Sequence, residues 1–214
     1  MTTAHQLAQP LINRLLQALV NRNTPLFVAL DGRSGSGKST IAAIVAEALG
    51  TDHQDRPIVT IIEGDQFYGG GNAATWDQRS TEEKVATVID WKRQRTLLES
   101  LRDAGAAIWY AFDWESDDWD ADIIPLSSEP IRCSATPIIL LEGAYSARPE
   151  LSDLLDLRVL LEIPRERRRA QLLAREGEEY RADWEERWVS AENHYFGTIV
   201  PAKEFDLVLS PTTT

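Results

Sequence analysis

A phosphate-binding loop signature follows directly after an apolar run near the start of the chain. Residues 26–30 read LFVAL, which predicts a strand buried on both faces, and residues 32–39 read GRSGSGKS. This segment fits the pattern G-x-x-x-x-G-K-[ST], in which the glycines let successive N–H groups point inward and the next helix directs its positive end to the same place. A chance glycine-rich turn is disfavoured, because strand, loop and helix occur in the required order. The sequence therefore predicts a site for a nucleoside triphosphate.

The residues of this loop have distinct expected roles. Lys38 supplies a mobile cation for the β- and γ-phosphates, and the hydroxyl of Ser39 is a ligand for Mg²⁺. ATP and Mg²⁺ are thus the expected cofactors, and the residues predicted to bind the nucleotide are Gly32, Arg33, Ser34, Gly35, Ser36, Gly37, Lys38, Ser39 and Thr40. The chain lacks an N-K-x-D guanine-reading segment and an L-S-G-G-Q-like transporter signature. Among nucleotide-binding proteins with this loop, the class that remains is the compact kinases. In these enzymes a second molecule accepts the γ-phosphoryl group.

Apolar runs alternate with helical periodicity along the chain, which favours an α/β fold with a mostly parallel sheet. With 214 residues we expect one domain over 1–214, built as a P-loop NTPase three-layer sandwich with a helical lid at about 164–183. A helical N-terminal extension is expected over 3–22. The predicted strands are 26–30, 58–62, 106–112, 138–141, 157–163 and 205–209. Further helices are expected at 41–49, from Ser80 onward, from Asp90 to Gly105, at 164–175 and at 183–199.

The charge balance argues against anionic macromolecular partners. Lys and Arg total 22 against 34 for Asp and Glu, a formal net charge of -12 that repels nucleic acid and anionic lipid surfaces. With a single cysteine, the chain cannot form an internal disulfide or a multi-cysteine metal centre. Its three scattered histidines argue against a histidine-rich metal centre. No apolar run approaches the roughly 18 residues of a membrane span. We expect a cytoplasmic protein that acts on a small-molecule acceptor. Both a monomer and a homo-oligomer are compatible with the sequence.

Two acids follow predicted strands, at the sheet edge where ligands of parallel sheets collect. Asp65 comes after the second strand, where it could accept the proton of an attacking hydroxyl or cap the next turn. Glu142 closes the strand at 138–141 and resembles a Walker B carboxylate that orients Mg²⁺, the alternative being a solvated side chain. Asp65 is therefore the candidate base and Glu142 a candidate metal ligand beside Ser39.

Arginines and aromatic residues supply the remaining candidates. Five arginines crowd residues 165–175, and Arg168 and Arg175, seven apart on one helix face, are predicted to close over the phosphates, while the rest face solvent. Aromatic side chains could stack on the acceptor or simply pack in the core. The residues predicted to contact the acceptor are Asp65, Tyr68, Tyr110, Asp113 and Trp114.

The order of these motifs resembles the uridine kinase family of P-loop phosphotransferases, which includes phosphoribulokinase-like and pantothenate kinase-like relatives. The resemblance runs from Leu26 to Leu209. Its pieces are GRSGSGKST (32–40), EGDQFY (63–68), Asp90-Trp91, YAFDW (110–114), LLEGAY (141–146), the arginine lid and PAKEFDLVL (201–209). It implies that Asp65 is the base for the acceptor hydroxyl and that Asp113 lies toward the substrate.

Two departures from this family fall on the acceptor side. Gln171-Leu172 stands where uridine kinases carry an arginine pair, and Trp114-Glu115 follows Asp113 where they have a histidine nearby. A nucleoside is the first candidate acceptor. A sugar, a vitamin precursor or an aminated natural product is the alternative, favoured by the acidic stretch 113–129. A third hypothesis is that the chain is a non-catalytic regulator that senses ATP. A fold shared with a family does not fix the substrate.

Overall fold

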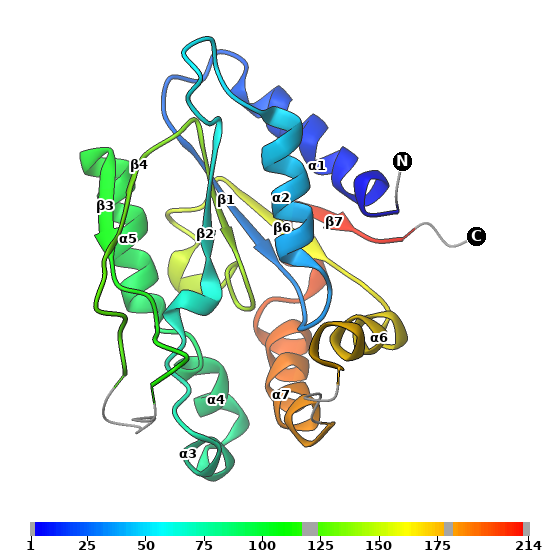
Figure 1. The fold of residues 1–214 in the computed structure, drawn as a ribbon. Coiled ribbons are helices and arrows are strands. Elements are labelled where there is room, and N and C mark those ends of the chain that lie inside the picture. Colours follow the sequence, from blue (N-terminus) through cyan, green and yellow to red (C-terminus); the bar gives the residue numbers. More distant parts are fainter. Residues whose placement is uncertain (1–2, 117–123, 178–181, 212–214) are drawn as a thin grey trace.

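A five-stranded parallel sheet forms the centre of the molecule. The computed structural model describes residues 3–116, 124–177 and 182–211 (Figure 1). The strands are β1 (Leu26–Asp31), β2 (Val59–Glu63), β5 (Ile138–Glu142), β6 (Leu157–Leu161) and β7 (Leu207–Leu209). They lie in the order β2-β5-β1-β6-β7, and every neighbouring pair is parallel. The predicted α/β fold class is confirmed.

Strand β1 shows why the sheet is buried on both faces. All six of its residues are buried. Leu26, Val28 and Leu30 pack into one hydrophobic cluster, whereas Phe27 and Ala29 pack into a second one on the opposite face. Successive side chains of a strand point to opposite faces, so a continuous apolar run supplies both cores. The sheet is therefore the middle layer of three.

Helices cover the two faces (Figure 1). Helices α1 (Thr3–Leu19) and α2 (Lys38–Leu49) share one cluster, and α5 (Trp91–Ala104) packs into the other. The predicted caps are present: Ser80 and Glu83 form a reciprocal capping box at α4 (Thr81–Thr87), and Asp90 caps α5. Helices α6 (Arg165–Glu176) and α7 (Ala182–His194) follow β6. None of the helices in these described residues is long and apolar enough to span a bilayer.

The region between α5 and β5 departs from the predicted strand order. Strand β3 (Ala106–Trp109) lies outside the main sheet and pairs antiparallel with β4 (Ile131–Ser134), which the sequence analysis did not identify. Its alternating exposed and buried pattern, unlike β1, suits a sheet with one solvated face. A helix that was also not predicted, α3 (Ala73–Gln78), is capped by the Asn72 side chain. Within the acidic stretch 113–129, residues 117–123 lie outside the described residues, as do residues 178–181 of the predicted lid.

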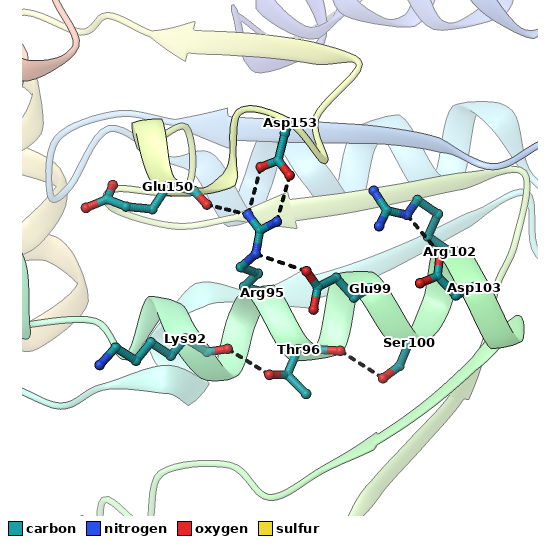
Figure 2. A network of polar contacts seen from close by, with 9 residues as sticks. All are labelled: Lys92, Arg95, Thr96, Glu99, Ser100, Arg102, Asp103, Glu150 and Asp153. Carbon is teal, nitrogen blue, oxygen red and sulfur yellow. Dashed lines mark hydrogen bonds and ion pairs between the residues drawn. The ribbon is translucent and has the colours of Figure 1, made fainter.

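Short helical turns connect the remaining elements. Two of them, η1 (Gly64–Phe67) and η2 (Pro149–Leu151), follow β2 and β5, and the π-helical turn η4 (Tyr195–Ile199) and η5 (Ala202–Glu204) lead to β7. Figure 2 shows how α5 is tied to the segment around η2. Arg95 donates to both carboxylate oxygens of Asp153 (2.7 and 2.6 Å) and to the Glu150 carbonyl (2.8 Å). This pairing lowers the pKa of Asp153 to about 2, whereas the buried side chains of Leu97, Leu98 and Leu101 pack α5 into the core.

Candidate active site

A cavity of about 530 Å³ lies at the carboxyl end of the sheet, around the phosphate loop. The loop leaves β1 and enters α2 at Lys38, and the loop residues 34–37 together with Lys38, Ser39 and Thr40 line the cavity. The ammonium group of Lys38 donates to the carbonyls of Gly32 (2.9 Å) and Arg33 (3.3 Å). The strand, loop and helix thus have the arrangement that the motif predicts.

Asp65 and Glu142 line the same cavity as the loop. Strands β2 and β5 are neighbours with Glu63 in register with Glu142, so the residues that follow them lie side by side. The backbones approach closely there: a Cβ on Gly64 would lie 2.9 Å from the carbonyl oxygen of Glu142. Two of the carboxylates predicted from strand ends are therefore brought together beside the phosphate loop.

The surroundings of Glu142 suit a metal-bound nucleotide. Its side chain is buried, and burial raises its pKa, while Lys38 and a hydrogen bond with Ser39 lower it. Asp65 and Glu63 add negative charge nearby, which also raises the pKa of Glu142. A hydroxyl and a carboxylate that already contact one another are hard oxygen donors of the kind that Mg²⁺ prefers. The two residues predicted as metal ligands fit a Mg²⁺ ion. A cluster of three or more His, Cys, Asp and Glu side chains able to hold a metal does not occur among the described residues.

Helix α6 lies across the phosphate loop. A Cβ on Gly35 would lie 2.7 Å from the Arg168 carbonyl oxygen and 2.8 Å from Cγ of Leu172, so a side chain at this loop position would collide with the helix. A Cβ on Gly37 would lie 3.8 Å from Oε1 of Gln171. Gln171 and Leu172, the pair that departs from uridine kinases, therefore cover the loop.

One of the two arginines predicted to close over the phosphates lines the cavity. Arg167, Gln171 and Arg175, spaced four apart, line the cavity, so the predicted Arg175 is among them. Arg168 does not line it. Its guanidinium instead donates to the carbonyls of Ser34 (3.1 Å) and Ile163 (3.2 Å). The spacing of the arginines in the sequence does not show which side of α6 faces the loop. The packing of Leu172 and the Arg168 carbonyl oxygen against Gly35 sets the orientation of the helix.

Of the residues predicted to contact the acceptor, only Asp65 lines this cavity. Tyr68 and Trp114 pack with Phe112 in an aromatic cluster. The ring of Tyr68 lies 5.0 Å from each of Phe112 and Trp114, and its hydroxyl donates to the Gly71 carbonyl (2.8 Å). Trp114 and Tyr110 are about half exposed, and Asp113 accepts a hydrogen bond from the Glu115 N–H (3.1 Å). The amide of Phe112 donates to the Gln66 carbonyl (2.7 Å), which attaches this cluster to the turn that carries Asp65.

Comparisons with known proteins place this geometry in a family. The family model described as "Phosphoribulokinase / Uridine kinase family" matches residues 27–204. The chain belongs to the phosphoribulokinase/uridine kinase family. It is a P-loop small-molecule kinase. No curated protein matches the sequence.

Two solved structures share the fold of this kinase. One, described as a possible uridine kinase from Bacillus stearothermophilus, is 21% identical, with a TM-score of 0.65 and coverage of 92% of this chain and 96% of that chain. The other, D-glycerate 3-kinase from Cryptococcus neoformans, is 12% identical, with a TM-score of 0.62 and coverage of 95% and 93%. At 21% and 12% identity, these two structures show only that the chain shares their fold.

A buried carboxylate that the sequence analysis missed anchors the start of the loop. Asp31 is fully buried and accepts four hydrogen bonds: from the N–H groups of Gly32 (2.7 Å), Tyr145 (3.0 Å) and Ala147 (3.0 Å) and from the hydroxyl of Tyr195 (2.8 Å). It joins the loop to the segments after β5 and α7. A signal was present, since an acid continues the apolar run LFVAL, where an unpaired charge would be costly.

The stability of the kinase should depend on pH through Asp31. Burial outweighs the four hydrogen bonds and raises the pKa of Asp31 from 3.8 to about 6. The folded state therefore holds the proton more tightly than the unfolded chain, so this contribution to stability grows as the pH falls from about 6 toward 4. Relative to Asp31→Asn, the wild type should gain about 2 kcal/mol of unfolding free energy between pH 7 and pH 4. Urea unfolding of both proteins measures this. Parallel curves across that range would contradict it.

A second buried carboxylate, Glu192 in α7, holds the loop from the other side. Its Oε1 accepts from the Ser34 N–H (2.6 Å), and its Oε2 lies 3.6 Å from Arg33 and 3.7 Å from Arg168. Arg168 in turn donates to the Ser34 carbonyl, so both backbone groups of Ser34 are held by a paired acid and base. No sequence pattern around Glu192 could have predicted this role, because its partner Ser34 lies 158 residues away in the chain.

We expect Glu192→Gln to weaken nucleotide binding more than turnover. Glutamine keeps an oxygen for the Ser34 N–H but loses the charge that holds both arginines, so the loop should lose its fixed shape. KM for ATP should rise about tenfold with kcat nearly unchanged, the scale of one charged hydrogen bond. Steady-state kinetics measure this split, with the exposed Glu204→Gln as the matched control. A fall in kcat at unchanged KM would contradict a positioning role.

Proposed function

We propose that this kinase, in the cytoplasm, transfers the γ-phosphoryl group of ATP to a hydroxyl of a small metabolite, with a nucleoside as the first candidate. The observation that carries the proposal is that Asp65 and the phosphate loop line one cavity. In this reaction the acceptor oxygen attacks the γ-phosphorus, and the bond to the β–γ bridging oxygen breaks. ADP leaves, and the proton of the hydroxyl goes to the Asp65 carboxylate.

Other residues of the cavity would bind the phosphates. Lys38 can turn from the loop carbonyls to the β- and γ-phosphates, and Arg167 and Arg175 present positive charge from α6. Ser39 and Glu142 would hold Mg²⁺, which when bound offsets negative charge on the β- and γ-phosphates. Asp65, in the same cavity, would then accept the proton of the acceptor hydroxyl.

The aromatic cluster supports a nucleoside as the acceptor. Tyr68, three residues after Asp65, packs with Phe112 and Trp114 from the segment after β3, and the exposed face of Trp114 could stack on a planar base. One of the structures similar to this chain is described as a possible uridine kinase.

A sugar or another polyol is the second candidate, supported by Gln94. Its amide is fully buried, forms no hydrogen bond with a described residue, and lies 3.6 Å from where a Cβ of Gly64 would be, beside Asp65. Buried amides normally have partners, so this one could serve the hydroxyls of an acceptor.

An acceptor screen tests these alternatives. Purified protein with MgATP is assayed for ADP release against nucleosides, sugars, vitamin precursors and aminated natural products, with Asp65→Asn as the inactive control. Release that depends on a nucleoside supports the first candidate. Failure of all nucleosides while a sugar works would replace it with the second. If no acceptor gave ADP release, and nucleotide-dependent capture of a partner protein were found instead, the chain would be an ATP-sensing regulator.

A further inference from the structure

The cavity continues past the phosphate loop to the first turns of α1. Thr3, Ala4 and Leu7 line it, facing Ile163, Gln171 and Leu172. In Figure 1 the start of α1 and helix α6 lie on one side of the lower end of α2, and the turn after β2 that carries Asp65 lies on the other side. The cavity therefore has two ends, with the phosphate loop between them.

The apolar stripe of α1 overhangs this second end. Ala8, Leu11, Ile12 and Leu15 are buried against the core, but the first members of the same stripe, Ala4 and Leu7, are only half-buried. Their exposed surface faces the cavity. Apolar side chains that the fold leaves partly uncovered inside a cavity are typical of ligand sites.

The expected direction of the triphosphate leads to this end. If Asp65 serves the acceptor, the γ-phosphate lies toward Asp65, and the α-phosphate lies on the other side of the Mg²⁺ ligand Ser39, toward Thr40 in the first turn of α2. The nucleoside would then extend from the loop on the side away from Asp65, where residues of α1 and α6 line the cavity. This step rests on the proposed function.

We propose that the N-terminal turns of α1 form one wall of the subsite for the heteroaromatic base of the nucleoside triphosphate. Ala4, Leu7 and Ile163 would contact the base faces, while Thr3 and Gln171 offer polar groups to its edge. The cavity of about 530 Å³ lies within the range of roughly 300–1,000 Å³ for small-molecule sites. The N-terminal extension thereby takes part in nucleotide binding as well as in packing.

The test compares a ligand that has a base with one that lacks it. Binding of MgATP and of inorganic tripolyphosphate is measured by calorimetry for the wild type, Ala4→Trp and Leu16→Trp. Tryptophan at position 4 fills the subsite, so the Kd for ATP should rise about tenfold while that for tripolyphosphate stays the same. Leu16 is exposed on the same helix, and its variant should bind both ligands like the wild type.

A milder variant keeps the proposal testable if Ala4→Trp does not fold. Leu7→Ala should weaken ATP binding about threefold, again without an effect on tripolyphosphate. Equal weakening of both ligands, or of neither, would overturn the proposal. Wild-type protein that binds ATP no tighter than tripolyphosphate would also overturn it, whatever the turnover. Protein that prefers ATP but releases no ADP with any acceptor would support the subsite while refuting the proposed transfer.

Discussion

Asp65→Asn should lower kcat by about 10²–10⁴-fold, the usual contribution of a general base, while the KM for ATP changes little. The carboxylate lines the cavity on the side of η1, and no hydrogen bond within the described residues requires its charge for folding. Asparagine has nearly the same shape but cannot take the proton of the acceptor hydroxyl. The measurement is steady-state turnover with the acceptor found in the screen, together with ATP titration.

The neighbouring Glu63→Gln variant is the matched control for this change. Glu63 is exposed at the end of β2, two residues before Asp65, but does not line the cavity. It removes the same charge from the same segment, so it should leave kcat within about twofold of the wild type, in line with an ordinary surface substitution. Turnover of Asp65→Asn close to that of Glu63→Gln would mean that Asp65 is not the base.

Lys38→Met should abolish most of the activity by a different route. Its ammonium now rests on the carbonyls of Gly32 and Arg33, within the loop that would surround the phosphates. Without it the charge that develops on the transferred group loses its nearest cation, and kcat should fall about 10²–10³-fold, as when one preorganised donor is removed. In contrast to Asp65→Asn, binding of MgATP should also weaken.

Calorimetry with MgATP separates the two variants, and thermal unfolding shows whether the loop still folds. Lys203→Met, which removes an exposed lysine from η5, is the matched control for the lost charge. If Lys38→Met bound and turned over ATP like this control, the loop would not be the phosphate site, and the proposed function would fail with it.

Local signals predicted the elements well where the interactions that make them are local. The Ser80–Glu83 capping box and the Asp90 cap join residues three positions apart, so the sequence alone contains both partners. The small sheet of β3 and β4 could not be predicted in this way. Its strands are separated by the long acidic connection, and the four residues of β4 carry no run of apolar character.

The phosphate-loop end of this protein could be predicted from residue order alone. A strand, a loop with fixed glycine, lysine and serine positions and a helix are contiguous, so their chemistry is encoded within fourteen residues, 26–39, and the acids after β2 and β5 follow from parallel strand ends. Residue order could not show which arginines of α6 face the loop, that Asp31 and Glu192 hold the loop, or that α1 reaches the cavity. The contacts of α6 and Glu192 with the loop, and of Asp31 with Tyr145, join residues more than a hundred positions apart, and α1 is held by its packing on α2. Close packing in three dimensions selects these contacts, and no local pattern in the sequence contains them.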